Sequence, residues 1–208
     1  MPVARKAVVT VLIWLLLCAG IVLVLYPYVD RWMQEKQQTR LLNEWKQYKN
    51  QLATQTGSTP PISQAPVSVE KPGDDGVLGM ISIDKIGLEE PILPGSEEEQ
   101  LRIGIGVVEP DRKPGEANNY VLAGHRSWTY GKQFSRLNEL AEGDLIRIES
   151  GNGNFEYYVT DTFLVKPEDI QVLDNSRGKS EITLITCDPP RNPTHRLIVK
   201  GTLRNGGK

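Results

Sequence analysis

The sequence predicts a mainly-β globular domain over residues 77–208, joined by a linker to an apolar N-terminal helix. Three observations carry this prediction. Residues 7–29 contain no charged side chain, residues 57–76 hold four prolines and three glycines, and the last 132 residues consist of short apolar or alternating segments separated by Gly, Pro, Asn and Asp. The last part is long enough for one domain with a substantial core.

Residues 1–29 are expected to form a short cytoplasmic tip and a transmembrane anchor. The uncharged run of 23 residues exceeds the roughly 20 that a helix needs to cross a bilayer. Tyr26 and Tyr28 suit an interfacial aromatic belt, whereas a cleavage site would need small residues there. Arg5 and Lys6 precede the run, which predicts a single-pass protein with its N-terminus in the cytoplasm and its domain outside the cell. A cleaved signal peptide is the alternative.

Residues 30–56 are expected to form a juxtamembrane helical stalk. Four large side chains recur at spacings of four, three and four, on one face of a helix: Leu41, Trp45, Tyr48 and Leu52. That face could pack on the globular domain or on a partner, and we interpret the segment as a membrane-proximal stalk. Residues 57–76 have few large apolar side chains and are expected to form a semi-extended linker.

The domain is expected to contain about eight strands and little helix. Alternating or short apolar runs of strand length mark the segments 80–86, 103–108, 120–123, 144–149, 155–159, 163–165, 182–186 and 197–199. Helical patterns are confined to short stretches at 97–102 and 134–140. About eight strands at this spacing predict a closed barrel or a sandwich, and periodicity alone does not choose between the two.

The charge balance argues against a nucleic-acid partner. The domain holds 16 Lys and Arg against 20 Asp and Glu, a formal charge of −4, whereas nucleic-acid binding calls for clustered positive charge. Glu97, Glu98 and Glu99 form an acidic run that resembles a calcium ligand set, but we interpret it as a solvated loop. We therefore expect no metal and no other cofactor.

Cys187 is the first candidate for chemistry, because it is the only thiol expected beyond the membrane. The second cysteine, Cys18, lies in the apolar segment and cannot reach it, so Cys187 is expected to be unpaired. Proteins outside the reducing cytosol usually pair their cysteines or lack them. A free thiol in that compartment favours a nucleophile, although burial in a core is the commoner fate of free cysteines in general.

A cysteine nucleophile needs a base or a cationic neighbour, because its thiol is mostly protonated near neutral pH. His125 lies at the end of an apolar strand, and the second histidine, His195, directly precedes Arg196. Neighbours on a strand point to opposite faces, so His195 faces away if Arg196 faces Cys187. His125 is then the better base, and Arg196 is a permanently charged donor for an oxyanion.

These residues, in this order, resemble the active site of the sortases. The matching segments are Ala123-Gly-His125, Thr183-Leu-Ile-Thr-Cys187 and Arg196 on the next strand, with Gly79-Met-Ile-Ser-Ile83, Pro91-Ile-Leu-Pro-Gly95 and Thr194-His-Arg-Leu-Ile-Val-Lys-Gly201 in the wider sequence. Together they cover essentially the whole domain, which makes the combined signal strong although each fragment alone is weak.

The resemblance implies an eight-stranded sortase-type β-barrel with short helices, and a membrane-anchored cysteine transpeptidase of a Gram-positive cell. Its partners would be secreted proteins with a C-terminal sorting signal of the Leu-Pro-X-Thr-Gly type, cleaved between Thr and Gly, and a peptidoglycan-precursor amine. Cys187 would form a thioester, Arg196 would stabilise the oxyanion or position the substrate, and His125 would protonate the leaving amine and deprotonate the incoming one. The product is a protein joined covalently to the cell wall.

Within the family the chain resembles class D most, with class A as the runner-up. Pilin-polymerising sortases tend to carry a lid with an Asp-Pro-aromatic motif and a second, C-terminal membrane helix, and we find neither pattern in the sequence. The segment Thr194-His-Arg-Leu197 and the short stretch that follows the last strand fit class D.

Other classes of cysteine protein fit less well. A papain-like enzyme or amidase normally places Cys before His, an L,D-transpeptidase needs Ser/His-Gly-Cys, and a redox protein needs Cys-x-x-Cys; the sequence has none of these patterns. Two alternatives stay open. One is a membrane-tethered binding module in which Cys187 is a buried structural residue, and the other is a pilin-polymerising enzyme of the same fold.

Overall fold

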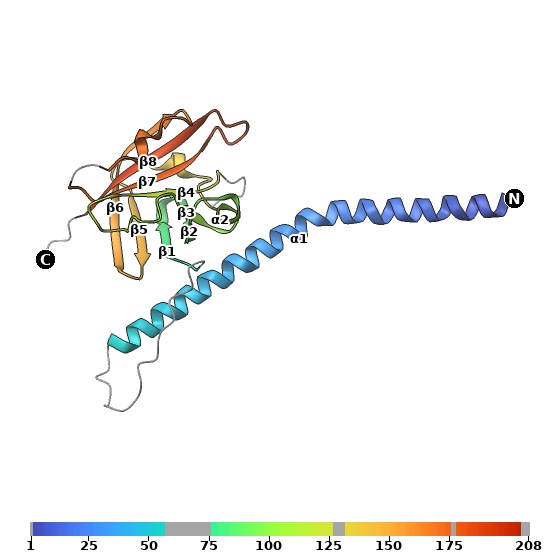
Figure 1. Cartoon of the computed structure of the whole chain (residues 1–208), viewed down its shortest axis with the longest axis horizontal. Helices are drawn as coiled ribbons and strands as arrows, with labels where there is room; N and C mark the ends of the chain where they lie inside the picture. Colours follow the sequence, from blue (N-terminus) through green and yellow to red (C-terminus); the bar gives the residue numbers. More distant parts are fainter. Residues whose placement is uncertain (1, 57–75, 127–131, 176–177, 205–208) are drawn as a thin grey trace, which may run out of the picture. The chain divides into compact units, whose positions relative to one another are not determined.

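The computed structural model describes residues 2–56, 76–126, 132–175 and 178–204. The chain divides into two compact units, Met1–Thr39 and Arg40–Lys208, and the second contains the strand-rich domain drawn from green to red in Figure 1. The expected linker over residues 57–76 lies almost wholly outside the described residues.

Helix α1 (Pro2–Thr56) is continuous, so the expected anchor and stalk belong to one helix. Pro27 lies inside it without ending it. Within the stretch Leu12–Tyr48 of α1, a window of 18 residues has a mean hydropathy of 2.4. Its length and composition therefore make α1 a candidate membrane span.

Within the described residues, eight strands close into a barrel in the order β1-β2-β3-β4-β7-β8-β6-β5. This confirms the mainly-β prediction and the eight-stranded barrel that the resemblance implied, a choice that periodicity alone left open. The strands are β1 (Gly79–Ile83), β2 (Leu88–Pro94), β3 (Ile105–Val107), β4 (Asn119–Ala123), β5 (Leu145–Ser150), β6 (Gly153–Val165), β7 (Glu181–Asp188) and β8 (His195–Leu203). The pairs β2–β3 and β4–β7 are parallel, and the other six pairs are antiparallel.

Four short helices connect the strands in the part of the domain that the structure describes: η1 (Asp84–Ile86), α2 (Glu98–Ile103), η2 (Leu137–Glu139) and η3 (Ile170–Leu173). The helix expected over 97–102 is α2, shifted by one residue. The helix expected over 134–140 is reduced to the single turn η2, and the end of the strand expected over 80–86 is the turn η1.

The strands predicted from the sequence contain two errors, which leave the predicted number of strands correct. The segments 155–159 and 163–165 are one strand, β6, with a register irregularity between Val159 and Asp161. Strand β2 was missed, because Glu89, Glu90 and Pro91 separate Leu88 from the short apolar stretch Ile92-Leu93. Glu90 is nevertheless 2% exposed, and its carboxylate accepts a hydrogen bond from the Gln133 N–H at 3.0 Å. A buried carboxylate with a backbone donor satisfies the rule that buried polar groups are paired.

The barrel encloses one large apolar cluster that includes the fully buried Phe134, Leu137 and Tyr157. Burial raises the pKa of Tyr157, whose hydroxyl accepts a hydrogen bond from the Gly115 N–H at 2.8 Å. Alternating inward residues of the strands fill the remaining space, as the closed sheet requires.

A second, smaller apolar cluster lies within the unit of residues 40–208 and includes the end of α1. Trp45 is 4% exposed and belongs to one buried cluster with Val77, Met80 and Leu93. The partly buried side chains packed against this cluster are Leu41, Leu42, Tyr48 and Ile103. The apolar face of the stalk thus packs on the globular domain, one of the possibilities that the sequence left open; the side chain of Leu52 lies outside the described residues.

The turn that leads into β5 is held by one carboxylate. Asp144 accepts hydrogen bonds from the Ala141 N–H at 2.7 Å and from Lys85 Nζ at 2.6 Å, which ties the turn to η1. Gly143 has a φ of 88°, a backbone conformation that residues other than glycine rarely adopt. Burial works to raise the pKa of Asp144, but the hydrogen bonds from Lys85 and the Ala141 N–H outweigh it and hold the pKa below its ordinary value.

We expect Asp144→Asn to lower the free energy of unfolding by about 1 kcal/mol at neutral pH, a small figure because Lys85 is half exposed. A carboxylate with a lowered pKa stabilises the fold above its ordinary pKa of about 4, and this contribution disappears as the pH falls through the lower folded value. Urea unfolding of the full chain in detergent should therefore show a difference in the free energy of unfolding between wild type and variant that disappears in acid. Glu142→Gln, an exposed carboxylate in the same turn, is the control. A difference that persists unchanged in acid would contradict the assignment.

Candidate active site

Cys187 and Arg196 lie directly opposite each other on the antiparallel strands β7 and β8. Residues paired in this way point to the same face of a sheet, with Cβ atoms about 4.5–5.5 Å apart. Both are partly exposed, so thiol and guanidinium reach the surface rather than the core. Figure 1 shows the two strands side by side. The hairpin therefore brings a nucleophile and a fixed cation together.

His125 follows β4 and lies toward the same end of the barrel as Cys187. Strands β4 and β7 are parallel, with Ala123 opposite Ile185, and the Gly124 N–H donates to the Ile185 carbonyl at 3.1 Å. Continuing this register by two residues brings His125 level with Cys187. Because β7 lies between β4 and β8 in the barrel, the base candidate and Arg196 flank the thiol from opposite sides.

Gly124 packs so closely against Ile105 and Phe134 that a side chain at this position would force them to shift. A methyl group at this position would lie 2.6 Å from Ile105 Cδ1 and 2.8 Å from Phe134 Cδ2. The Gly124 carbonyl accepts a hydrogen bond from the buried Thr186 hydroxyl at 2.8 Å. The backbone before His125 is thereby held against the residue before Cys187.

The register of β4 and β7 is set at their other end by Asn119, which is fully buried. Its amide donates to the carbonyls of Val172 at 3.0 Å and Asp174 at 3.2 Å, and its side-chain oxygen accepts from the Thr183 hydroxyl at 2.7 Å. Thr183 lies on β7, so Asn119 ties both parallel strands to the segment that includes η3. The polar atoms of this amide are paired, as burial demands.

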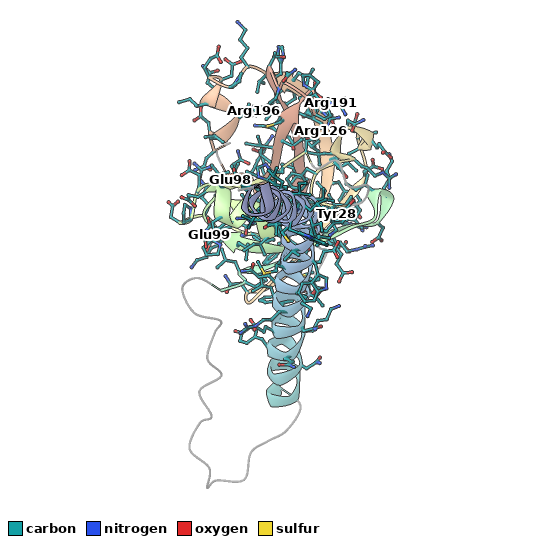
Figure 2. All side chains as sticks on the ribbon, turned by 90° about the vertical axis from the view of Figure 1, so that its right-hand side faces the viewer. Tyr28, Glu98, Glu99, Arg126, Arg191 and Arg196 are labelled. Atoms are coloured by element: carbon teal, nitrogen blue, oxygen red, sulfur yellow. The ribbon has the colours of Figure 1, made fainter. Side chains whose placement is uncertain are left out.

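Glu98 lies beside His125, a contact that our interpretation of the acidic run did not predict. Its carboxylate is 3.7 Å from His125 Nε2, although the Glu98 side chain is 79% exposed. Figure 2 labels Glu98 and Glu99 on the α2 side of the domain. Part of the acidic run interpreted as a solvated loop therefore contacts the base candidate. Nothing local in the sequence signals this, because α2 precedes β3 and His125 follows β4.

His195 is held away from this arrangement. Its Nδ1 atom lies 2.9 Å from the Thr194 hydroxyl, and His195 pairs in register with Asp188 rather than Cys187. His195 and Arg196 are neighbours on β8 and point to opposite faces. The structure thus groups His125, Cys187 and Arg196 at the ends of adjacent strands and leaves His195 outside the group.

These three groups can serve the three roles that acyl transfer requires. The thiol is a nucleophile, the imidazole carries protons and the guanidinium is a donor for the oxyanion. Both cysteines are free, which leaves Cys187 available for such chemistry. Within the described ranges, no group of three or more His, Cys, Asp or Glu side chains is arranged to hold a metal ion.

Comparison with known proteins adds an independent finding. The sequence profile of the sortase domain matches residues 81–204. Sortase A of Bacillus anthracis is 31% identical over 206 residues, covering 96% of each chain. The solved structure of a Clostridium perfringens sortase D5 transpeptidase has a TM-score of 0.60 at 26% identity, over 82% of this chain and 98% of that one. Sortase C-1 of Actinomyces oris also has a TM-score of 0.60, at 27% identity, over 80% of this chain and 98% of that one.

We expect Asn119→Ala to lower the free energy of unfolding by about 2–4 kcal/mol, because it removes three hydrogen bonds of a fully buried side chain, one buried and two partly buried, and leaves their partners unpaired. Thr183→Val removes one of the three and should cost about 1 kcal/mol. Urea unfolding of the full chain in detergent measures both. The neighbouring amide of Asn118, whose bond to the Lys113 carbonyl is exposed, provides the control as Asn118→Ala. Equal stability of the two alanine variants would contradict the role given to Asn119.

Proposed function

The chain belongs to the sortase family, whose members are cysteine transpeptidases, and on that premise we propose that it cleaves a Leu-Pro-X-Thr-Gly-like sorting signal between Thr and Gly and joins the protein to a cell-wall peptidoglycan amine. The observation that carries the proposal is the register of β8 on β7, which pairs Arg196 with Cys187, beside the strand end that leads to His125.

The first half of the reaction cleaves the sorting signal. The Cys187 thiol passes its proton to His125 as the sulfur attacks the Thr carbonyl carbon, and the carbonyl oxygen becomes an oxyanion that the Arg196 guanidinium stabilises. The C–N bond then breaks, the leaving Gly nitrogen takes a proton from His125, and a thioester remains on Cys187. Arg196 suits this task because its charge does not depend on pH and its planar donors hold a fixed direction.

The second half transfers the acyl group to an amine. The amine of a peptidoglycan precursor attacks the thioester carbonyl while His125 accepts its proton. The tetrahedral intermediate forms against Arg196 again, and its collapse breaks the C–S bond. The products are an amide and a free Cys187, whose sulfur takes the proton back from His125, so the site is ready for another cycle.

The proposed location follows from α1. An uncleaved anchor with Arg5 and Lys6 in the cytoplasm would leave the barrel on the outer surface. There it would meet secreted proteins as they emerge and the membrane-bound precursor of the wall.

A second candidate function is polymerisation of pilins, which the similarity to sortase C-1 favours. Its chemistry differs only in the acceptor, which is then a lysine side chain of another protein. We propose wall anchoring in a class D-like enzyme, with class A as the runner-up, on the sequence segment Thr194-His-Arg-Leu197. The identity of the acceptor amine separates the two functions.

We expect the full chain in detergent, given a panel of sorting-motif peptides and an amine, to form an acyl adduct on Cys187 and a transpeptidation product. Mass spectrometry detects both. Cys187→Ala and His125→Ala should lose all measurable turnover, and Arg196→Lys should lower kcat/KM about 10–100-fold because the planar donor is lost. His195→Ala is the matched control and should keep nearly full activity.

Three results would count against the proposal. Full activity of Arg196→Lys would remove the oxyanion role. A product formed only with a lysine-bearing pilin peptide would favour polymerisation. An unreactive Cys187 in a folded chain, with no adduct from any peptide, would favour a binding module of the same fold.

A further inference from the structure

Arg126 directly follows His125, and its guanidinium is almost completely buried, with 9% of the side chain exposed. Its Nη1 atom forms an ion pair with the carboxylate of Asp188, the residue that follows Cys187. The same nitrogen lies 3.5 Å from the Cys187 carbonyl oxygen, and Nη2 donates to Asn138 Oδ1 at 2.9 Å. Figure 2 labels Arg126 and Arg196 on the same part of the domain.

A buried guanidinium is costly to desolvate, and partners for its donors offset that cost. In Arg126 both Nη atoms have partners, whereas the buried Nε has none among the described residues. Here the partners come from β7, through Asp188 and the Cys187 carbonyl, and from η2, through Asn138. The planar fork of an arginine can satisfy several such oxygens only from one orientation. Arg126 is therefore a rigid tie between the end of β4, the end of β7 and the connection that follows β4.

This tie lies just past the end of the backbone pairing. Strand β4 ends at Ala123, and the Gly124 N–H makes one further hydrogen bond to the Ile185 carbonyl at 3.1 Å. His125 and Cys187 both lie beyond that bond. The ion pair of Arg126 and Asp188 joins the two residues that come immediately after them, so it extends the link between the strands past both reacting groups.

We propose that Arg126, together with Asp188, is a positioning residue that sets the imidazole of His125 against the thiol of Cys187. The inference rests on the proposed transpeptidase function and adds a residue to it. Arg126 acts through its neighbours, since a side chain with 9% exposure offers a peptide almost no surface. Its contact with the Cys187 carbonyl also restrains the backbone that carries the nucleophile. Both reacting groups consequently depend on one ion pair.

The test compares Arg126→Gln, Arg126→Lys and Asp188→Asn in the full chain in detergent. Misplacing a reacting group by about 1 Å costs about 100-fold in rate. Arg126→Gln should accordingly lower kcat about 10–100-fold, with KM changed less than about threefold, because substrate contacts are untouched. Arg126→Lys should recover part of the loss, and Asp188→Asn should show a smaller loss of the same kind.

Arg112 provides a matched control at the other end of the same strand pair. Its Nη1 donates to the carbonyls of Asn119 at 3.1 Å and Leu173 at 2.6 Å, so Arg112→Gln also removes a partly buried arginine. It should lower the unfolding temperature but leave kcat per folded molecule unchanged. If both glutamine variants lose activity only in proportion to their unfolded fraction, the positioning role is wrong.

Alkylation of Cys187 by iodoacetamide tests the same role without a peptide substrate. Arg126→Gln and Asp188→Asn should each slow alkylation several-fold in the folded chain, because a displaced His125 no longer lies where it can take the proton of the attacking thiol. Arg112→Gln should match wild type. Equal alkylation rates in wild type and all three variants would overturn the proposal, even if no peptide is turned over. Slower alkylation of the Arg126 and Asp188 variants without any peptide turnover would support the positioning role while the transpeptidase function fails. Should Arg126→Gln not fold, Asp188→Asn decides on its own.

Discussion

A fully buried asparagine, Asn119, holds the parallel strands β4 and β7 in register through hydrogen bonds to the Thr183 hydroxyl and to the carbonyls of Val172 and Asp174. Everything at the other end of these strands depends on that register. A slip of one residue would turn every side chain of a strand to the opposite face. The Cys187 thiol would then leave the face that it shares with Arg196.

The two strands are therefore fixed at both ends by polar contacts, with the apolar core between them. At one end Asn119 pairs with β7 and with the segment that includes η3, and at the other Arg126 pairs with Asp188 and Asn138. Buried polar groups of this kind are costly when unpaired and restrictive when paired. This barrel places such groups at the start and beyond the end of β4, the strand that leads to His125, and the proposed function would use the resulting rigidity to hold His125 and Cys187 in place.

Much of the fold could be predicted, and the errors have physical causes. The expected strands appear, but β6 was divided in two because its exposed polar residues between the apolar runs read as a loop. Strand β2 was missed because Glu90 and Pro91 look like turn residues, while the barrel buries both. The helical stripe with Trp45 was evident from its spacing, yet its burial with Met80 depends on a surface that belongs to another segment.

The sequence by itself determined the apolar helix, the strand-rich domain and the three candidates for chemistry, His125, Cys187 and Arg196, because apolar runs, alternation and short motifs are local patterns. Only the tertiary structure decided which strands are neighbours and that Arg126 and Glu98 contact the groups around the candidate site, whereas closure into a barrel was implied by the family resemblance and not by periodicity. The physical reason is that strand pairing and burial of ionic groups depend on segments far apart in the chain, whose approach no local pattern encodes.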